Sequence, residues 1–304
     1  MFKFFIFSYQ EWWMKQPHSQ SLSIINSISH WLNDVSLFDS AWRKVSVGVW
    51  PWLWSHQLCS LTVSVWTPLL AIEGTRRNIP YVWAYMLLGQ VVAISVASAL
   101  FFVVMLTHTP IPSRQPSEKL LKSLSVSTIG GLITVILSPF VASTELFMPN
   151  LLIMHILLIL PLIYKQHHQQ QNNKPSYSIT IFIMLIYTIA AGANLAIYVN
   201  QWFECLTTIS LDTNSSIFID IYHKVVNTFF SHPAQSSISY DIVCMQLIST
   251  AWMWVYSRSN FTEIPKWTYA LMIITPLLSA SVTLPLFIVG CEYQHLLLDN
   301  KKIS

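Results

Sequence analysis

The sequence predicts an all-α membrane protein: a polytopic transmembrane helical bundle of about seven spans, preceded by an N-terminal amphipathic segment at the membrane interface. The first observation is composition. Of the 304 residues, 53% are hydrophobic and only 10% are charged, with a mean hydropathy of +0.50, whereas soluble proteins carry roughly 25% charged residues. The second is that the apolar residues fall into segments of about 20, the length at which a helix crosses a bilayer.

The predicted elements follow one another along the chain. The arm at residues 1–48 is expected to be cytosolic or interfacial, because its first apolar run is too short for a signal-peptide core and residues 24–37 are amphipathic. A transmembrane domain covers 49–292 and a tail follows at 293–304. We expect spans at 49–72, 81–106, 126–147, 151–164, 177–199, 237–256 and 267–290. The fourth is short and follows the third closely, so the two could form a tight hairpin, or one could be tilted or broken.

The distribution of Lys and Arg predicts the orientation. With a cytosolic N-terminus, most basic residues fall on the cytosolic side, among them Arg43, Lys44 and Arg114, while Arg76 and Arg77 fall on the other. Because cytosolic loops carry the excess of positive charge, we predict that the N-terminus is cytosolic and the C-terminus lumenal. If one span is miscounted, the predicted side of the membrane is reversed for every later loop.

Several function classes lack the residues that they need. The basic residues are scattered, which argues against nucleic acid as a partner. The chain has no DxxxD or DDxxD pair for a magnesium-diphosphate site, no HxxxH or HxxHH for a di-iron site, and no GxGxxG or Walker loop. We therefore expect no metal and no cofactor. Acid chemistry without a metal remains, as does binding or transport without chemistry.

Three acids lie in or beside predicted spans, where a charge is costly and a functional role is the first hypothesis. Glu73 closes the first span, Glu145 lies late in the third, and Asp241 lies early in the sixth. With the orientation above, all three belong to one side of the membrane. This convergence predicts a shared site there.

Asp241 and Trp252 are eleven residues apart, a spacing that returns to the same face of a helix. An acid at the rim with an indole deeper on the same wall suits a pocket for an apolar, electron-rich substrate. The alternative is an interfacial acid held by a neighbouring donor, with a tryptophan that faces lipid.

Glu73 can pair with Arg76 or Arg77 at helical spacing, with Asn78 as a further hydrogen-bonding group. The pair either marks the end of a span or orients a carboxyl group at a cavity mouth. Glu145 has no such partner in sequence and could be capped by backbone instead of acting in catalysis. Gln90 on the second span offers a hydrogen bond to another helix or to a substrate.

The segment WTPLLAIEGTRRNIPYVWAYMLLGQVVAISVASALFFVVML, residues 66–106, resembles the small integral-membrane terpene cyclases of fungal meroterpenoid and indole-diterpene biosynthesis. The segment SYDIVCMQLISTAWMWVYS, residues 239–257, is similar to the Tyr-Asp pair and the Trp-rich stretch of that group. The long N-terminal arm and the long fifth loop, residues 200–235, depart from the pattern and leave open a diverged member that does not cyclise.

The resemblance implies a seven-helix enzyme of the endoplasmic reticulum membrane that cyclises a polyprenyl chain attached to a polar head, by protonation of an olefin or epoxide. Other enzymes of the pathway would be possible partners. The resemblance makes Glu73 and Asp241 the acid candidates, Arg77 and Asn78 their orienting neighbours, and Trp252 a cation stabiliser. Apart from the resemblance, we add Glu145 as a catalytic candidate and Gln90 and Tyr240 as substrate-binding candidates. Two other hypotheses are a small-molecule transporter or receptor, and a scaffold subunit of a biosynthetic complex.

Overall fold

The fold was described from a computed structural model, which covers residues 2–16, 23–111, 113–163, 177–209 and 216–303. All regular structure within these residues is helical. The all-α prediction is therefore confirmed. Among the described residues, three helices are long and apolar enough to cross a membrane, fewer than the seven spans predicted: Val49–Arg76, Glu118–Val141 and Tyr177–Thr207.

The helices, in chain order, are α1 (Phe2–Met14), α2 (Ile24–Asp34), α3 (Leu37–Ser46), α4 (Val49–Leu61), the π-helix η1 (Thr62–Trp66), α5 (Thr67–Arg76), α6 (Val82–Val91), α7 (Ile94–Thr107), α8 (Glu118–Val141), α9 (Phe147–Ile163), α10 (Tyr177–Thr207), α11 (Ile217–Phe230), α12 (Pro233–Asn260), α13 (Lys266–Leu278) and α14 (Ala280–Ile303).

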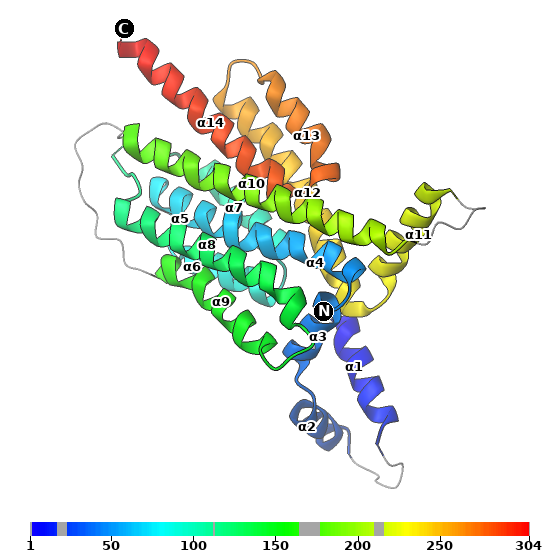
Figure 1. Ribbon diagram of the computed structural model, residues 1–304. Coiled ribbons are helices and arrows are strands. Elements are labelled where there is room, and N and C mark those ends of the chain that lie inside the picture. Colours follow the sequence, from blue (N-terminus) through cyan, green and yellow to red (C-terminus); the bar gives the residue numbers. More distant parts are fainter. Residues whose placement is uncertain (1, 17–22, 112, 164–176, 210–215, 304) are drawn as a thin grey trace.

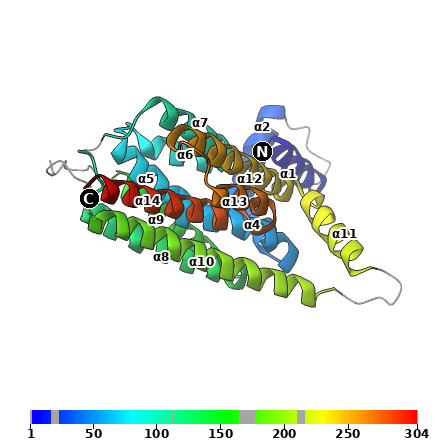
Figure 2. The ribbon, with the colours of Figure 1, turned by 90° about the horizontal axis from the view of Figure 1, so that it is seen from above.

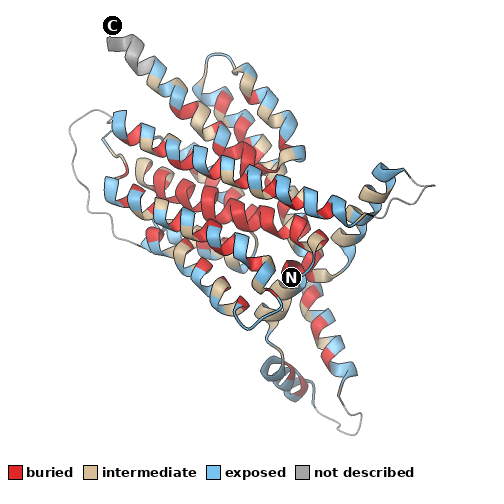
Figure 3. Ribbon diagram, viewed as in Figure 1, coloured by how far each residue is buried: buried red, intermediate tan, exposed pale blue. Residues whose placement is uncertain are grey.

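The continuous helix α4–η1–α5 is the centre of the bundle, and 89% of its most apolar window is buried (Figure 3). It widens into π geometry just before Pro68, which has no N–H to donate to the carbonyl of Ser64. Gly131 allows α8 to approach this helix closely, since a Cβ there would lie 2.7 Å from that of Val63. The surrounding helices α8, α9, α10 and α12 turn apolar side chains outward, as helices in lipid do.

The third and fourth predicted spans form the antiparallel pair α8 and α9, which confirms the tight-hairpin alternative with a shifted boundary. The turn comprises residues 142–146, and the Met-Pro-Asn sequence at 148–150 lies in the first turn of α9. Asn150 donates from Nδ2 to the carbonyl of Thr134 at 3.0 Å and so ties the two helices together.

The predicted span at residues 81–106 is wrong, because this segment folds back on itself. Helix α6 ends at Val91 and α7 begins at Ile94. The rings of Tyr85 and Phe101 lie 5.2 Å apart, and Gly89 meets Ile94 and Ala97, as an antiparallel pair requires. At 1.5 Å per residue, α6 is about 15 Å long, well short of an apolar core of about 30 Å. This pair is named the first hairpin.

The predicted span at 267–290 is also two helices. Helices α13 and α14 meet at Ser279, and the hydroxyls of Thr275 and Thr283 lie 2.8 Å apart across the pair. The indole of Trp267 packs directly against Gly290, and a Cβ at this position would lie only 2.7 Å from the ring. Position 290 therefore requires glycine. In Figure 1 the two helices are the orange and red arms beside α12. This pair is named the second hairpin.

Both hairpins have their open ends at the end of the bundle where α5 finishes, here called the Arg76 end. The backbone N–H of Ile111 donates to the carbonyl of Arg76 at 2.8 Å, so the segments before and after the first hairpin meet. The orientation predicted from basic residues assumed that this segment crosses the membrane. Arg77 and Arg114 lie at the same end of the bundle, so the segment between them does not cross the membrane. The loops after it therefore no longer fall on the sides of the membrane that were predicted for them.

The opposite end of the bundle, here called the α3 end, holds α3, the start of α4 and the start of α12. Figures 1 and 2 both show α1, α2 and α11 projecting at this end, away from the C-terminus. Helix α2 packs Trp31 against Ser8 of α1 and leaves Ile24, Ile25 and Leu32 exposed. Such a one-sided helix agrees with the predicted interfacial segment.

Candidate functional site

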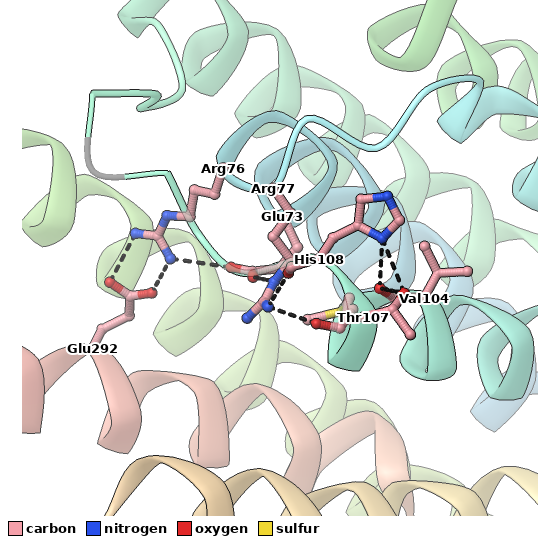
Figure 4. A network of polar contacts seen from close by, with 8 residues as sticks. Glu73, Arg76, Arg77, Val104, Thr107, His108 and Glu292 are labelled. Atoms are coloured by element: carbon pink, nitrogen blue, oxygen red, sulfur yellow. Dashed lines mark hydrogen bonds and ion pairs between the residues drawn. The ribbon is translucent and has the colours of Figure 1, made fainter.

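Four charged side chains form a cluster at the Arg76 end (Figure 4). Glu73 accepts from Arg76 Nη1 at 3.1 Å and from Arg77 Nε at 2.8 Å, so the ion pairs predicted at helical spacing are confirmed. Glu292 of α14 also pairs with Arg76, whose Nη2 lies 3.0 Å from Oε2. The four side chains are only 7–14% exposed and balance two positive charges with two negative ones.

The cluster holds the open ends of both hairpins against the central helix. Arg77 Nη1 donates to the carbonyls of Met105 and His108, both at 2.7 Å, at the end of α7 where helix carbonyls lack partners. Arg76 reaches α14 through Glu292. Because these ion pairs are buried, removal of one partner would leave an uncompensated charge, which is strongly destabilising.

Two polar atoms at the cluster are buried without a hydrogen-bond partner in the described part of the chain: Nε of Arg76 and the hydroxyl of Tyr187. Tyr187 lies within electrostatic range of Glu73, Glu292 and Arg76. Since nearly all buried polar atoms in proteins are hydrogen-bonded, such a pair calls for an explanation. A bound polar group would supply one.

A continuous row of aromatic rings passes through the interior, and one of them, Tyr256, lies within electrostatic range of Glu73, Arg77 and Glu292. Successive centroids are 4.6–6.2 Å apart, and Trp252 stacks on Phe102 with an interplanar angle of 6°. Trp66 lies seven residues before Glu73 and Phe287 five before Glu292. The row consists, in order, of Tyr85, Phe101, Trp66, Phe102, Trp252, Tyr256, Phe287 and Trp267.

Asp241 lies elsewhere. Its carboxylate accepts the backbone N–H groups of Ile94 at 3.0 Å and Ser95 at 2.8 Å, at the start of α7. Arg77 binds the other end of the same helix, about 15 Å away by the rise from Ser95 to Met105. The predicted convergence of the acids is therefore wrong. Asp241 and Trp252 do face the same neighbour, α7, as their spacing predicted.

Glu145 does not join either group. It is exposed in the turn between α8 and α9, at the α3 end, where Arg43 of α3 donates to the carbonyls of Ala142 and Thr144. Its predicted position late in a span is wrong because α8 ends at Val141.

The other residues predicted to bind the substrate lie apart from one another. Asn78 is exposed at the Arg76 end, where its Oδ1 accepts from Arg114. Gln90 bonds within its own helix, from Nε2 to the sulfur of Met86 at 3.6 Å. Tyr240 is 54% exposed and packs its ring edge-on against Phe229, 4.7 Å away. Of the predicted substrate-binding residues, only Arg77 and Trp252 belong to the cluster or to the row of rings.

Glu292 was missed by sequence reasoning. It follows the predicted last span by two residues, so the rule that singled out acids beside spans applies to it as much as to Glu73. By sequence it is the last residue of the predicted transmembrane domain and has no assigned role. The second hairpin brings it back to the central helix, 216 positions from its partner Arg76.

Comparison with protein families finds one described as "Protein of unknown function DUF2834", which matches residues 208–292. The match runs from before α11 into α14 and includes Asp241, Trp252 and Glu292. No curated protein and no solved structure is significantly similar to the chain.

Proposed function

We propose that this chain is a membrane-embedded terpene cyclase, which protonates an olefin or epoxide of a prenylated substrate and lets the resulting cation close rings. The observation that carries the proposal is the row of aromatic rings, one of which, Tyr256, lies within electrostatic range of Glu73, Arg77 and Glu292 of the buried cluster. Aromatic faces stabilise a cation, most strongly where water is excluded.

The two segments that resemble terpene cyclases support this reading, because they pack against each other. Phe102 belongs to the first segment and Trp252 to the second, and their rings stack at 4.6 Å. The resemblance also supports a location in the membrane of the endoplasmic reticulum.

The substrate's polar head would lie at the cluster. Arg76 Nε can donate a hydrogen bond and the Tyr187 hydroxyl can donate or accept one, and neither has a partner among the described residues. The prenyl chain would then follow the rings from Phe287 toward Trp66. Ordering of the chain along these rings would bring a double bond or epoxide close to a carboxyl group.

The proton donor must carry a proton before the reaction, and this requirement distinguishes the candidate acids from one another. Glu73 lies between two guanidinium groups, and Asp241 accepts two backbone N–H groups; both arrangements stabilise the ionised form. Glu292 is also ionised in the ion pair, but its single partner is Arg76, which it shares with Glu73, so a substrate head that draws Arg76 away would leave this carboxylate free to take up a proton. We therefore assign the donor role to Glu292.

The proposed step is balanced within the site. The Glu292 carboxyl gives its proton to the substrate carbon or epoxide oxygen, and Arg76 stabilises the carboxylate that remains. A neighbouring double bond attacks the cation and forms the ring bond. The last cation loses a proton, which can return to the Glu292 carboxylate.

The test uses membranes that contain the full chain, incubated with prenylated and epoxyprenylated aromatic precursors. An isomeric product with one or more new rings, detected by mass spectrometry and NMR, is expected. Glu292→Gln should abolish it, and Trp252→Leu should slow it. The matched control Glu204→Gln changes an exposed acid of α10 and should have no effect.

Full turnover by Glu292→Gln would refute the donor assignment. The absence of any cyclised product from a correctly folded chain, across both precursor classes, would refute the function itself.

A further inference from the structure

The direction of each helix decides at which end of the bundle the loops lie. Helices α8 and α9 form an antiparallel pair whose turn is at the α3 end, so α8 begins and α9 finishes at the Arg76 end. Helix α10 runs back to the α3 end, where Gln201 donates to the carbonyl of Val49 at 2.7 Å. Helix α12 returns to the Arg76 end, since Tyr256 in its last turns lies within electrostatic range of Glu73.

The two hairpins both start and finish at the Arg76 end, so neither changes side. The ring of Phe261, directly after α12, packs against that of His295 in α14, with centroids 6.2 Å apart. The N-terminus therefore lies at the α3 end and the C-terminus at the Arg76 end, as Figures 1 and 2 show. Because the predicted span at 81–106 is a hairpin, the loops from Arg114 to Lys266 lie opposite to the side of the N-terminus on which they were predicted, or the reverse.

Lysine and arginine are concentrated at the Arg76 end. Among the described residues, nine of them lie there and five lie at the α3 end. Segment 164–176, which is outside the described residues, connects the end of α9 to the start of α10 and contains Lys165 and Lys174. The nine are Arg76, Arg77, Arg114, Lys119, Lys122, Arg258, Lys266, Lys301 and Lys302, and the five are Lys3, Lys15, Arg43, Lys44 and Lys224.

The difference remains when the less informative charges are left out. Basic residues influence orientation over roughly 15–20 residues from the end of a span. Lys3, Lys15, Lys301 and Lys302 lie farther than that from any helix that runs between the two ends. The two arginines of the charge cluster are buried and balanced there by two glutamates. Five residues at the Arg76 end then stand against three at the α3 end, and the two lysines of segment 164–176 add to the five.

The exposed side chains show the same asymmetry. At the Arg76 end, the exposed basic residues outnumber the exposed acids Glu118 and Glu263 within the described part of the chain. At the α3 end, the exposed lysines are matched by as many exposed acids, which are Glu11, Asp34, Glu145 and Glu204. The cytosolic leaflet of a membrane carries anionic lipids, whose negative surface potential attracts lysine and arginine. The exposed basic residues of the Arg76 end are Lys119, Lys122, Arg258 and Lys266.

We infer that the Arg76 end faces the cytosol and its anionic lipid headgroups, while the α3 end, with the N-terminus and helices α1, α2 and α11, faces the lumen. The physical reason is the excess of lysine and arginine, which marks the cytosolic side of a membrane protein. This orientation is the reverse of the one predicted from the sequence. The charge cluster then lies on the cytosolic side, and the polar head of the substrate is bound from there, a consequence that rests on the proposed function.

The test places one new cysteine at each end of the full chain and measures its reaction with a membrane-impermeant maleimide. Thr262→Cys lies between α12 and α13, and Asn227→Cys lies on α11; both positions are exposed and neither change alters a charge. In sealed microsomes, whose outer surface is cytosolic, Thr262→Cys should be labelled as strongly as after detergent. Asn227→Cys should be labelled only once detergent opens the vesicles. The parent chain, three of whose four cysteines are buried, is the matched control for background labelling.

A second pair of exposed positions repeats the measurement, so that one misfolded variant does not decide the result. Ser113→Cys, before α8, should behave as Thr262→Cys does, and Ser36→Cys, between α2 and α3, as Asn227→Cys does. Labelling of the α3-end cysteines alone in sealed microsomes would overturn the orientation. Equal labelling of both ends there, while a resident lumenal protein stays unlabelled, would overturn it as well. The labelling needs no turnover, so the orientation and the proposed cyclase can fail independently.

Discussion

The carboxylate of Asp241 accepts the backbone N–H of Ser95 at 2.8 Å and thereby joins the start of α7 to α12. Together with the bond from Ile94, it satisfies the first two N–H groups of a helix that begins inside the bundle. An acid that resembles a catalytic group in sequence thus has a structural role. A negative charge at this position also complements the positive end of the α7 dipole.

Removal of the Asp241 cap should destabilise the protein. Loss of a helix cap costs typically about 1 kcal/mol, and about 2 in the strongest cases. We expect Asp241→Ala to lower the midpoint of thermal unfolding in detergent, and Asp241→Asn, which can still accept one N–H, to lower it less. An Asp241→Ala protein as stable as the parent would contradict the capping role.

The buried cluster should show strong coupling between Glu73 and Arg77. Arg77→Met leaves Glu73 with one partner and the carbonyls of Met105 and His108 with none, a change expected to cost about 3–5 kcal/mol. Adding Glu73→Gln removes the excess negative charge that this change leaves in the cluster and should recover part of the loss. Purely additive unfolding free energies in a double-mutant cycle would show that the two side chains do not interact.

Two helical glycines should respond in opposite directions to alanine. A methyl group at Gly131 would meet the branched side chain of Val63 at 2.7 Å and separate α8 from the central helix. Overpacking of this kind costs about 1–3 kcal/mol. Gly192 of α10 has nothing within 4 Å of the added methyl, so Gly192→Ala should stabilise by about 0.5–1 kcal/mol. Thermal unfolding of both variants checks the difference.

His232 should make the docking of α1 sensitive to pH. Partial burial, and then the positive charge of Lys44, lower the pKa of this imidazole below 6.5. The neutral ring accepts the N–H of Ala234 at 3.2 Å and packs edge-on against Phe7, and protonation removes that acceptor. Since the unfolded chain binds the proton more readily, this contribution to stability is present above pH 6.5 and is lost as the pH falls toward the lowered pKa.

The pH effect can be measured as the change in unfolding midpoint between about pH 7.5 and pH 5.5, a range that spans the ordinary pKa of histidine. His232→Asn retains a good capping group without the titration and should show a smaller change. An equal change in both proteins would assign the pH dependence to other residues.

Local sequence was sufficient wherever the interaction lies within a few turns of one helix. The helical class and the pairing of Glu73 with Arg76 and Arg77 follow from residues three and four apart, and the shared face of Asp241 and Trp252 follows from the helical repeat. Each is set by the geometry of a single helix, so no knowledge of its neighbours is needed.

Tertiary structure decided where the chain turns back. Val92 and Ala93 are neither glycine nor proline, and the segment around them is as apolar as a straight span, so its composition cannot reveal a hairpin. The break is stabilised by Asp241, 147 residues from Ile94. The return of Glu292 to Arg76 depends in the same way on the second hairpin. Both come from contacts between distant segments, whose geometry only the packed bundle defines.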